Sequence, residues 1–262
     1  MEAVSGSSSS VLIRRDDRRS DVSTASMGRS PIVVTEFVET VAEFHARLPD
    51  DRAPVRPDDP IRVWHCRPTD RAVVLGSTQS IELLDRAACR TTGYEIVRRR
   101  SGGGLVLVER GRTVWVDVVV PHGHALWSDD IDRSAAWLGN CWRNTLASLG
   151  IEGLDVHEGA MERPPWSREV CFLGRASGEV TMGSRKAVGI SQRRTRDWCR
   201  LQSSLSLRWE AETLRQLLAE PRPPLETLSE AGTDLPLVED EVVRVLIGEV
   251  ERVARGGADH GR

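Results

Sequence analysis

The stretch RRRSGGGLVLVERG, residues 98–111, decides the fold class of this chain. Its three consecutive glycines, 102–104, cost backbone entropy, so close approach of the backbone to a ligand is one reason to expect them there. Arg99, Arg100 and Ser101 stand beside them with hydrogen-bond donors suited to a carboxylate or a phosphate. The other interpretation is a flexible hairpin connection with incidental arginines, and the loop alone leaves both open.

The pattern on either side of this loop predicts the architecture. The glycine spacing is neither the G-x-G-x-x-G of dinucleotide-binding folds nor the G-x-x-x-x-G-K-[ST] of a P-loop. Short apolar or alternating runs predict strands, and four stretches with helical spacing or composition predict helices. The predicted strands are 61–66, 72–76, 94–100, 104–109, 113–121, 155–159, 169–174, 179–182, 186–191 and 201–209, and the predicted helices are 35–48, 130–150, 211–220 and 239–256. Strands without regular βαβ alternation favour an α+β fold with a mainly antiparallel sheet.

Local signals refine these elements. Arg110-Gly111-Arg112 suits a tight hairpin between the strands 104–109 and 113–121. Asp130 or Asp132 is the expected N-cap of the helix 130–150. In the last helix, an apolar stripe is expected on one face. The residues of that stripe are Val242, Val243, Leu246, Val250 and Val253.

Three regions follow from composition. Residues 1–30 are rich in serine and arginine and predict a disordered tail, and residues 31–220 form the expected catalytic domain. Residues 221–262 comprise a proline-rich break and a C-terminal helix. No apolar run approaches the roughly 20 residues that cross a bilayer, and no signal-peptide core follows the N-terminus. We therefore expect a cytoplasmic protein that does not bind membranes.

Charge and cysteine content exclude further classes. A net charge of −3 and a pI near 6.1 give no reason to expect nucleic-acid binding. The five cysteines are odd in number and none is spaced C-x-x-C, so reduced thiols are expected rather than a disulfide framework or a zinc site. His122 and His124 share a strand face but lack a third ligand, so no metal site is predicted.

Lys186 is the only lysine among 36 basic residues. A bias toward arginine replaces lysine wherever any cation serves, but not where a compact ammonium is required. In the segment 183–196, Lys186 opens a predicted strand and shares a face with Val188 and Ile190. A desolvated lysine there could polarise a carbonyl or balance an acyl phosphate. The alternative is an edge-strand lysine that discourages aggregation.

Cys171 is the other candidate reactive side chain. A cysteine beside Phe172 on a predicted strand is most often a small buried hydrophobic residue. Alternatively it accepts an acyl group, which requires access and a positive field from Arg168, Arg175 or Lys186. Composition alone favours the first interpretation.

These elements, in this order, resemble the lipoate–protein ligase A family within the biotin/lipoate attachment superfamily. The matching stretches are 73–79, 98–111, 113–121, 184–194 and 201–209. The resemblance implies a biotin/lipoate ligase-like domain that attaches a lipoyl or octanoyl group to a lysine of a lipoyl domain, in a 2-oxoacid dehydrogenase E2 or a glycine cleavage H protein. It also implies that Lys186 contacts the acyl carbonyl. The acyl- or adenylate-binding residues would be Gly76, Gln79, Arg99, Arg100, Ser101, Gly102, Gly103, Gly104, Gly189, Ser191 and Gln192.

Departures from the family pattern leave open the route by which the acyl group is activated. Val108 and Ser203 stand where the family usually or often has histidines, and no Asn-Asp pair precedes the lysine motif as in ATP-using ligases. Cys171, fifteen residues before Lys186, resembles the cysteine-dependent octanoyl and lipoyl transferases. One route uses free lipoate, ATP and Mg²⁺. The other uses octanoyl carrier protein or a lipoyl domain as donor and needs no cofactor. A non-catalytic acyl-binding protein is the rival from another class.

Overall fold

The computed structural model describes residues 13–15 and 30–259, with side chains from residue 30 to residue 256. Most of the predicted disordered tail therefore lies outside the described residues. Within it, Ile13–Arg15 form the short strand β1, which pairs in parallel with the strand β2 (Ile32–Glu39).

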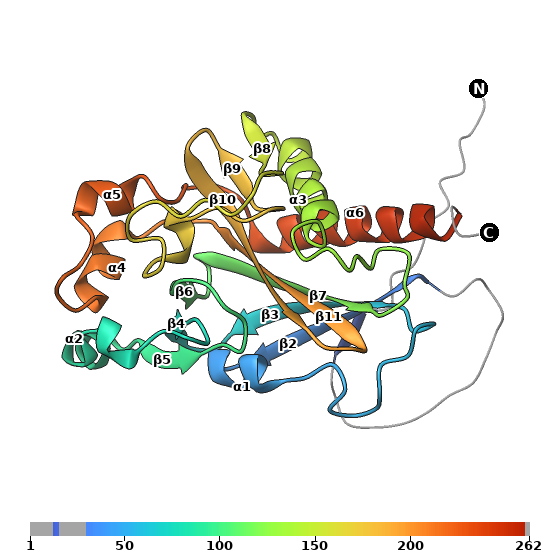
Figure 1. Cartoon of the computed structure of the whole chain (residues 1–262), viewed down its shortest axis with the longest axis horizontal. Coiled ribbons are helices and arrows are strands. Elements are labelled where there is room, and N and C mark those ends of the chain that lie inside the picture. The colour runs from blue at the N-terminus through green and yellow to red at the C-terminus, as the bar shows by residue number, and fades with distance from the viewer. Residues whose placement is uncertain (1–12, 16–29, 260–262) are drawn as a thin grey trace.

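The main element is an eight-stranded sheet in the order β1-β2-β3-β7-β11-β10-β9-β8 (Figure 1). Its other strands are β3 (Ile61–Pro68), β7 (Thr113–Pro121), β8 (Leu154–Val156), β9 (Val180–Met182), β10 (Arg185–Arg194) and β11 (Trp198–Ser206). The pairs β1/β2 and β2/β3 are parallel, and the other five pairs are antiparallel. The predicted α+β class with a mainly antiparallel sheet is confirmed.

A second, three-stranded sheet lies beside the first. It has the order β5-β4-β6 and comprises β4 (Arg71–Leu75), β5 (Glu95–Arg98) and β6 (Val106–Glu109). The glycine loop joins β5 to β6. The predicted hairpin of 104–109 with 113–121 is wrong, because β6 pairs with β4 while β7 joins the large sheet. At Arg110-Gly111-Arg112 the chain passes from the small sheet to the large sheet and does not form a hairpin.

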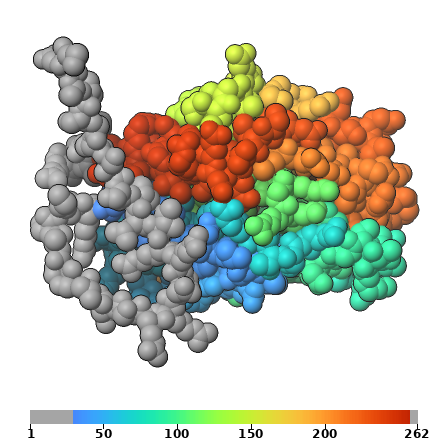
Figure 2. All heavy atoms as spheres, turned by 180° about the vertical axis from the view of Figure 1, so that it is seen from behind, coloured from blue at the N-terminus to red at the C-terminus, as the bar shows by residue number. Residues whose placement is uncertain are grey.

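Helices cover both sheets. On one face of the large sheet, α3 (Ala136–Ser148) packs against α6 (Glu239–Asp259), and the outer side of α6 lies on the surface (Figures 1 and 2). Val242, Leu246 and Val250 are fully buried there, so the predicted apolar stripe is confirmed at its centre. The short helices are α1 (Val41–Ala46), α2 (Arg86–Thr92), α4 (Ala211–Leu217), α5 (Leu225–Ser229) and the 3₁₀ turns η1 (Ile81–Leu83) and η2 (Cys171–Leu173).

The predicted helix 35–48 is wrong in its first half. Residues 32–39 form β2, which pairs in parallel with β3, and the helix α1 begins only after Thr40. The Thr40 hydroxyl accepts a hydrogen bond from the backbone N–H of Glu43, and the Glu43 carboxylate accepts one from the backbone N–H of Thr40. This capping box fixes where the strand ends and the helix starts.

Two further expectations are corrected. Residues 169–174 form the 3₁₀ turn η2 with its approach rather than a strand, because their backbone bridges to Leu105 instead of entering a ladder. The helix α3 begins at Ala136, and its N-cap Ala135 has no side-chain cap. The Asp130 carboxylate instead accepts a hydrogen bond from the N–H of Asp132 in the preceding turn.

The segment after Pro221 reaches the start of β10. The backbone N–H of Lys186 donates to the carbonyl of Ala231 at 2.9 Å, and Leu235 donates to Leu207 at 3.0 Å. The backbone of Lys186 is therefore held by β9 on one side and by Ala231 on the other. The division of the chain at residue 220 stays a prediction. In the described residues, no helix is long and apolar enough to cross a membrane.

Candidate active site

The glycine loop is required by close packing. A Cβ on Gly76 would lie 1.9 Å from the carbonyl oxygen of Gly103, and a Cβ on Gly104 would lie 2.5 Å from the backbone nitrogen of Cys171. Gly103 also has a φ of 98°, a region that glycine adopts at little cost. A Cβ on Gly102 would meet nothing within 4 Å. The loop is thus wedged between the turn after β4 and η2, which a merely flexible connection would not need.

Buried polar side chains hold this loop in place. Arg99 is 4% exposed, and its guanidinium donates to the carbonyls of Gly102 at 2.8 Å and Gly104 at 2.7 Å. The Ser101 hydroxyl donates to the side-chain oxygen of Gln202 at 2.8 Å and lies 3.0 Å from the Ser191 hydroxyl. These bonds attach the loop to β10 and β11.

Gln79 and Gln192 form hydrogen bonds that hold the segments around the glycine loop together. The Gln79 amide accepts from the N–H of Gly76 and donates to the carbonyls of Arg168 and Glu169. The Gln192 amide accepts from the Ser134 hydroxyl at 2.7 Å. Each of these glutamines therefore joins two chain segments that are distant in sequence.

Lys186 faces inward, as predicted, and is 1% exposed. Its Nζ lies 2.6 Å from Oε2 of Glu179 and donates to the backbone carbonyl of Cys171 at 2.8 Å. Glu179 is itself fixed, because it accepts hydrogen bonds from the backbone N–H groups of Ala176 and Ile190. An ammonium has three N–H donors, so one remains for a further acceptor. The predicted alternation along β10 is interrupted, because its register with β9 shifts between Lys186 and Val188.

Cys171 is the accessible thiol of the chain. Of the five cysteines, all in the described part of the chain, it alone is half-buried while the others are buried. Its backbone is anchored through its N–H, which donates to the Leu105 carbonyl at 3.0 Å, and through its carbonyl, which accepts from Lys186. A Cβ on Gly103 would lie 3.8 Å from Sγ and 2.9 Å from Nη2 of Arg99. The thiol thus lies beside the glycine loop and next to two cationic side chains.

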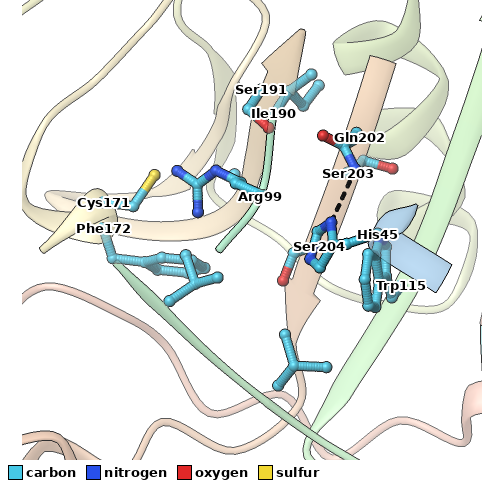
Figure 3. Close-up of a pocket in the computed structure, with 13 residues that line it drawn as sticks. His45, Arg99, Trp115, Cys171, Phe172, Ile190, Ser191, Gln202, Ser203 and Ser204 are labelled. Carbon is cyan, nitrogen blue, oxygen red and sulfur yellow. Dashed lines mark hydrogen bonds between the residues drawn. The ribbon is translucent and has the colours of Figure 1, made fainter. Parts of the chain in front are cut away.

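Two cavities meet at this cysteine. The larger, which we call the outer cleft, has a volume of about 1080 Å³ and is lined on one side by the glycine loop. The smaller, the inner pocket, has a mostly apolar wall that includes Val106, Val108, Trp115 and Phe172 (Figure 3). Cys171, Ile190 and Ser191 line both cavities.

The two cavities collect most of the predicted site residues. Those on the outer cleft are Gln79, Gly102, Gly103, Gly104, Cys171, Lys186, Ser191 and Gln192. Those on the inner pocket are Arg99, Cys171, Gly189 and Ser191. Gly76 and Ser101 support the loop without lining either cavity, and Arg100 is exposed and lines neither.

A match to a known family agrees with this arrangement. Residues 44–234 match the sequence model described as the lipoyl protein ligase A/B catalytic domain. This chain belongs to that family. The resemblance drawn from the glycine and lysine motifs is confirmed.

Individual relatives of this lipoyl protein ligase A/B member are distant. The octanoyltransferase LipM of Clostridioides difficile is 27% identical over 154 residues, which cover 58% of this chain and 56% of that protein. The chain spans about half the length of the curated relatives it matches.

Solved structures share the fold. A lipoate-protein ligase A bound with ATP has a TM-score of 0.60 and 18% identity, covering 76% of this chain and 75% of that chain. A bi-partite lipoate protein ligase from Thermoplasma acidophilum, studied with its E2 lipoyl domain, has a TM-score of 0.60 and 19% identity, covering 76% and 73%. At these identities the likeness shows the fold alone.

Within the lipoyl protein ligase A/B fold, three residues of this site were not predicted from the sequence. Glu179 pairs with Lys186, Gln202 binds the glycine loop, and His45 of α1 lines the inner pocket. Gln202 stands beside Ser203 in a matching stretch and could have been included on that ground. Glu179 and His45 carry no local signal, because only the fold brings them to the site.

The inner pocket also contains both positions at which the family pattern has histidines. Val108 and Ser203 line this pocket in the present chain. Burial lowers the pKa of His45, which lines the same pocket, to about 3, with smaller effects from the positive charges of Arg200 and Arg99. The pocket therefore holds a neutral imidazole, but this imidazole comes from α1 and not from β6 or β11, where Val108 and Ser203 lie.

Proposed function

We propose that this chain transfers an octanoyl or lipoyl group to a lysine of a lipoyl domain through a thioester on Cys171. The observation that carries the proposal is the position of Cys171 at the junction of the inner pocket and the outer cleft. An acyl group on Sγ would place its chain in the apolar pocket. Its carbonyl would then face the cleft, where a second substrate can approach.

The chemistry comprises two balanced acyl transfers. The Cys171 thiolate attacks the carbonyl carbon of a donor thioester, a new C–S bond forms, and the donor thiolate leaves and takes up a proton. The amine of the acceptor lysine then attacks the same carbon, an amide forms, and the Cys171 thiolate leaves while the amine loses a proton. The donor would be an octanoyl carrier protein or a lipoyl domain, and the acceptor an E2 subunit or an H protein.

Lys186 is the group that can stabilise the oxyanion in both steps. Two of its three N–H donors are occupied by Glu179 and by the Cys171 carbonyl. The third is free for the acyl oxygen, and it acts from a buried position where such a charge-assisted bond is strong. Arg99 supports the glycine loop and adds a second positive charge near the thiol.

The charges of the site fit a thioester carbonyl better than they fit the phosphates of ATP. The ammonium of Lys186 is already neutralised by a carboxylate at 2.6 Å, which would also repel a phosphate placed beside it. The outer cleft is lined by three further acidic side chains, Glu82, Glu162 and Glu169, which outnumber its two arginines, Arg163 and Arg168. We therefore propose that no cofactor is needed, and we keep the route through ATP and Mg²⁺ as an outcome of the test. The five unpaired cysteines support a reducing, cytoplasmic location.

Intact-mass spectrometry of the full chain with a lipoyl domain tests this function. One reaction contains octanoyl carrier protein, and the other contains lipoate, ATP and Mg²⁺. The proposal expects the lipoyl domain to gain one octanoyl group in the first reaction only. It also expects an acylated form of the chain itself that Cys171→Ser eliminates, with Cys141→Ser as the matched control.

Two results would replace the proposal. Acylation that requires ATP and persists in Cys171→Ser would establish the ligase route. No acylation in either reaction, together with measurable binding of octanoate, would establish a non-catalytic acyl-binding protein.

A further inference from the structure

The inner pocket of this chain has a hydrogen-bond donor at a place that the family pattern does not predict. His45 reaches the pocket from α1, whereas Val108 and Ser203, at the two histidine positions of the family pattern, offer no imidazole. Figure 3 shows His45 and Cys171 on opposite sides of the pocket with Arg99 between them. An acyl chain that enters this pocket from Cys171 would therefore have His45 in the far wall.

A buried network fixes which nitrogen of His45 carries the proton. The Gln202 amide accepts from the Ser101 hydroxyl and donates to Oδ2 of Asp117 at 3.3 Å, which settles the orientation of that amide. The same amide nitrogen lies 3.5 Å from Nδ1 of His45. Nδ1 is therefore the acceptor, and the neutral ring carries its hydrogen on Nε2.

Asp117 makes this arrangement rigid. Its carboxylate accepts hydrogen bonds from Nε of Arg200 at 2.6 Å and from Nε1 of Trp115 at 2.7 Å, and it is completely buried. The Trp115 ring lies beside the His45 ring, with 4.5 Å between their centroids. The imidazole is thus held by its neighbours on one side and open to the pocket on the other.

The Nε2–H group of His45 makes no hydrogen bond to any described residue. An occupant of the pocket that supplies an acceptor to this donor gains a hydrogen bond and is favoured over an occupant that supplies none. The walls around this donor are largely apolar, which suits the methylene part of an acyl chain.

We propose that His45 makes the inner pocket selective for acyl chains that carry a hydrogen-bond acceptor, an oxygen or a sulfur, near the end remote from the carbonyl. The lipoyl group, with its ring sulfurs, and ω-hydroxyacyl groups belong to this class, whereas the octanoyl group does not. This inference rests on the proposed function for the identity of the site, but it concerns binding and does not need the thioester on Cys171.

Calorimetric titration of the full-length chain with octanoate, 8-hydroxyoctanoate and lipoate tests the inference. The first two ligands have the same chain and differ in one terminal hydroxyl. We expect 8-hydroxyoctanoate and lipoate to bind about 5- to 10-fold more tightly than octanoate, the ratio that one net hydrogen bond provides. In His45→Phe this preference should disappear, while in His45→Gln, which keeps an N–H donor, part of it should remain.

Several outcomes would overturn the inference. These are equal or tighter binding of octanoate by the native chain, a preference that survives in His45→Phe, or a preference that His45→Gln loses completely. The thermal midpoint of each variant identifies an unfolded protein, and His124→Phe serves as a control outside the pocket. Selective binding without any acyl transfer would leave this inference standing and overturn the proposed function, whereas transfer without selectivity would do the reverse.

Discussion

The carboxylate of Glu179 lies 2.6 Å from the ammonium of Lys186, and both side chains are almost completely removed from solvent, at 2% and 1% exposed. They are seven positions apart in sequence, and the antiparallel pairing of β9 with β10 brings them together. The single lysine of the chain is therefore neutralised and oriented before any substrate arrives.

Glu179→Gln should destabilise the protein and slow acyl transfer. Removing one partner of a buried ion pair leaves the other charge uncompensated, at a cost of about 3–5 kcal/mol. Urea unfolding gives the stability and the mass-spectrometric assay gives the rate. Glu241→Gln is the control, because that side chain is 52% exposed on α6 and pairs with Arg244 across 3.8 Å.

The double variant Glu179→Gln with Lys186→Met separates stability from chemistry. Removing both charges together should recover much of the lost stability, because no unpaired charge remains. Acyl transfer should stay absent, because the donor to the acyl oxygen is gone. Recovery of activity in the double variant would contradict the role proposed for Lys186.

Alkylation should be confined to Cys171. The other four thiols are buried, and burial raises the pKa of Cys141 to about 12 and that of Cys199 to about 11. Brief treatment with iodoacetamide near neutral pH should therefore add one group, which peptide mapping locates at Cys171. Preincubation with octanoyl carrier protein should protect this site. If another cysteine reacted first, Cys171 would no longer be a candidate for the acyl acceptor.

Alanine substitutions in the glycine loop should have graded effects. Gly104→Ala places a methyl group 2.5 Å from the backbone nitrogen of Cys171, so η2 must move and both stability and transfer should fall. Gly102→Ala meets nothing within 4 Å and is the matched control, with nearly native behaviour expected. Thermal unfolding and the transfer assay compare the two. Similar losses in both variants would show that flexibility rather than close packing explains the loop.

Stability should decrease in mild acid because of His45. The pKa of this histidine is about 3 in the folded chain and returns to its ordinary value near 6.5 on unfolding. Between these values the unfolded chain binds a proton that the folded chain does not, so stability falls as the pH decreases, by about 1.4 kcal/mol per unit. Urea unfolding at several pH values should give a shallower slope for His45→Phe. Parallel slopes would contradict the assigned protonation state.

The fold was predictable because its signals are local. The glycine loop and the lone lysine lie in short stretches whose backbone requirements and composition can be seen directly. The error at 35–48 has a physical cause: Phe37, Val41, Phe44 and Leu48 fit helical spacing and are all packed in one core. Phe37 nevertheless belongs to β2, Val41 and Phe44 belong to α1, and Leu48 follows the end of that helix. The β-branched run of residues 32–34 was the signal that should have favoured a strand.

The site was less predictable because its supporting contacts are non-local. Gln202 and His45 are 157 residues apart, and Ser101 and Gln202 are 101 residues apart. No periodicity or motif spacing links such positions, so only the assembled sheets can show that they share one network. Arg100 illustrates the reverse case, since its position beside the glycines suggested a role while its side chain points to solvent.

The meeting of the two cavities at one sulfur has a kinetic consequence. Because Cys171 opens to a single large cleft, the acyl donor and the acceptor lysine must approach the same atom through the same space. The two carrier proteins would then exclude one another, so the first must depart before the second can dock. Steady-state rates should follow a ping-pong pattern, with parallel double-reciprocal lines and mutual competitive inhibition at high concentrations of either carrier.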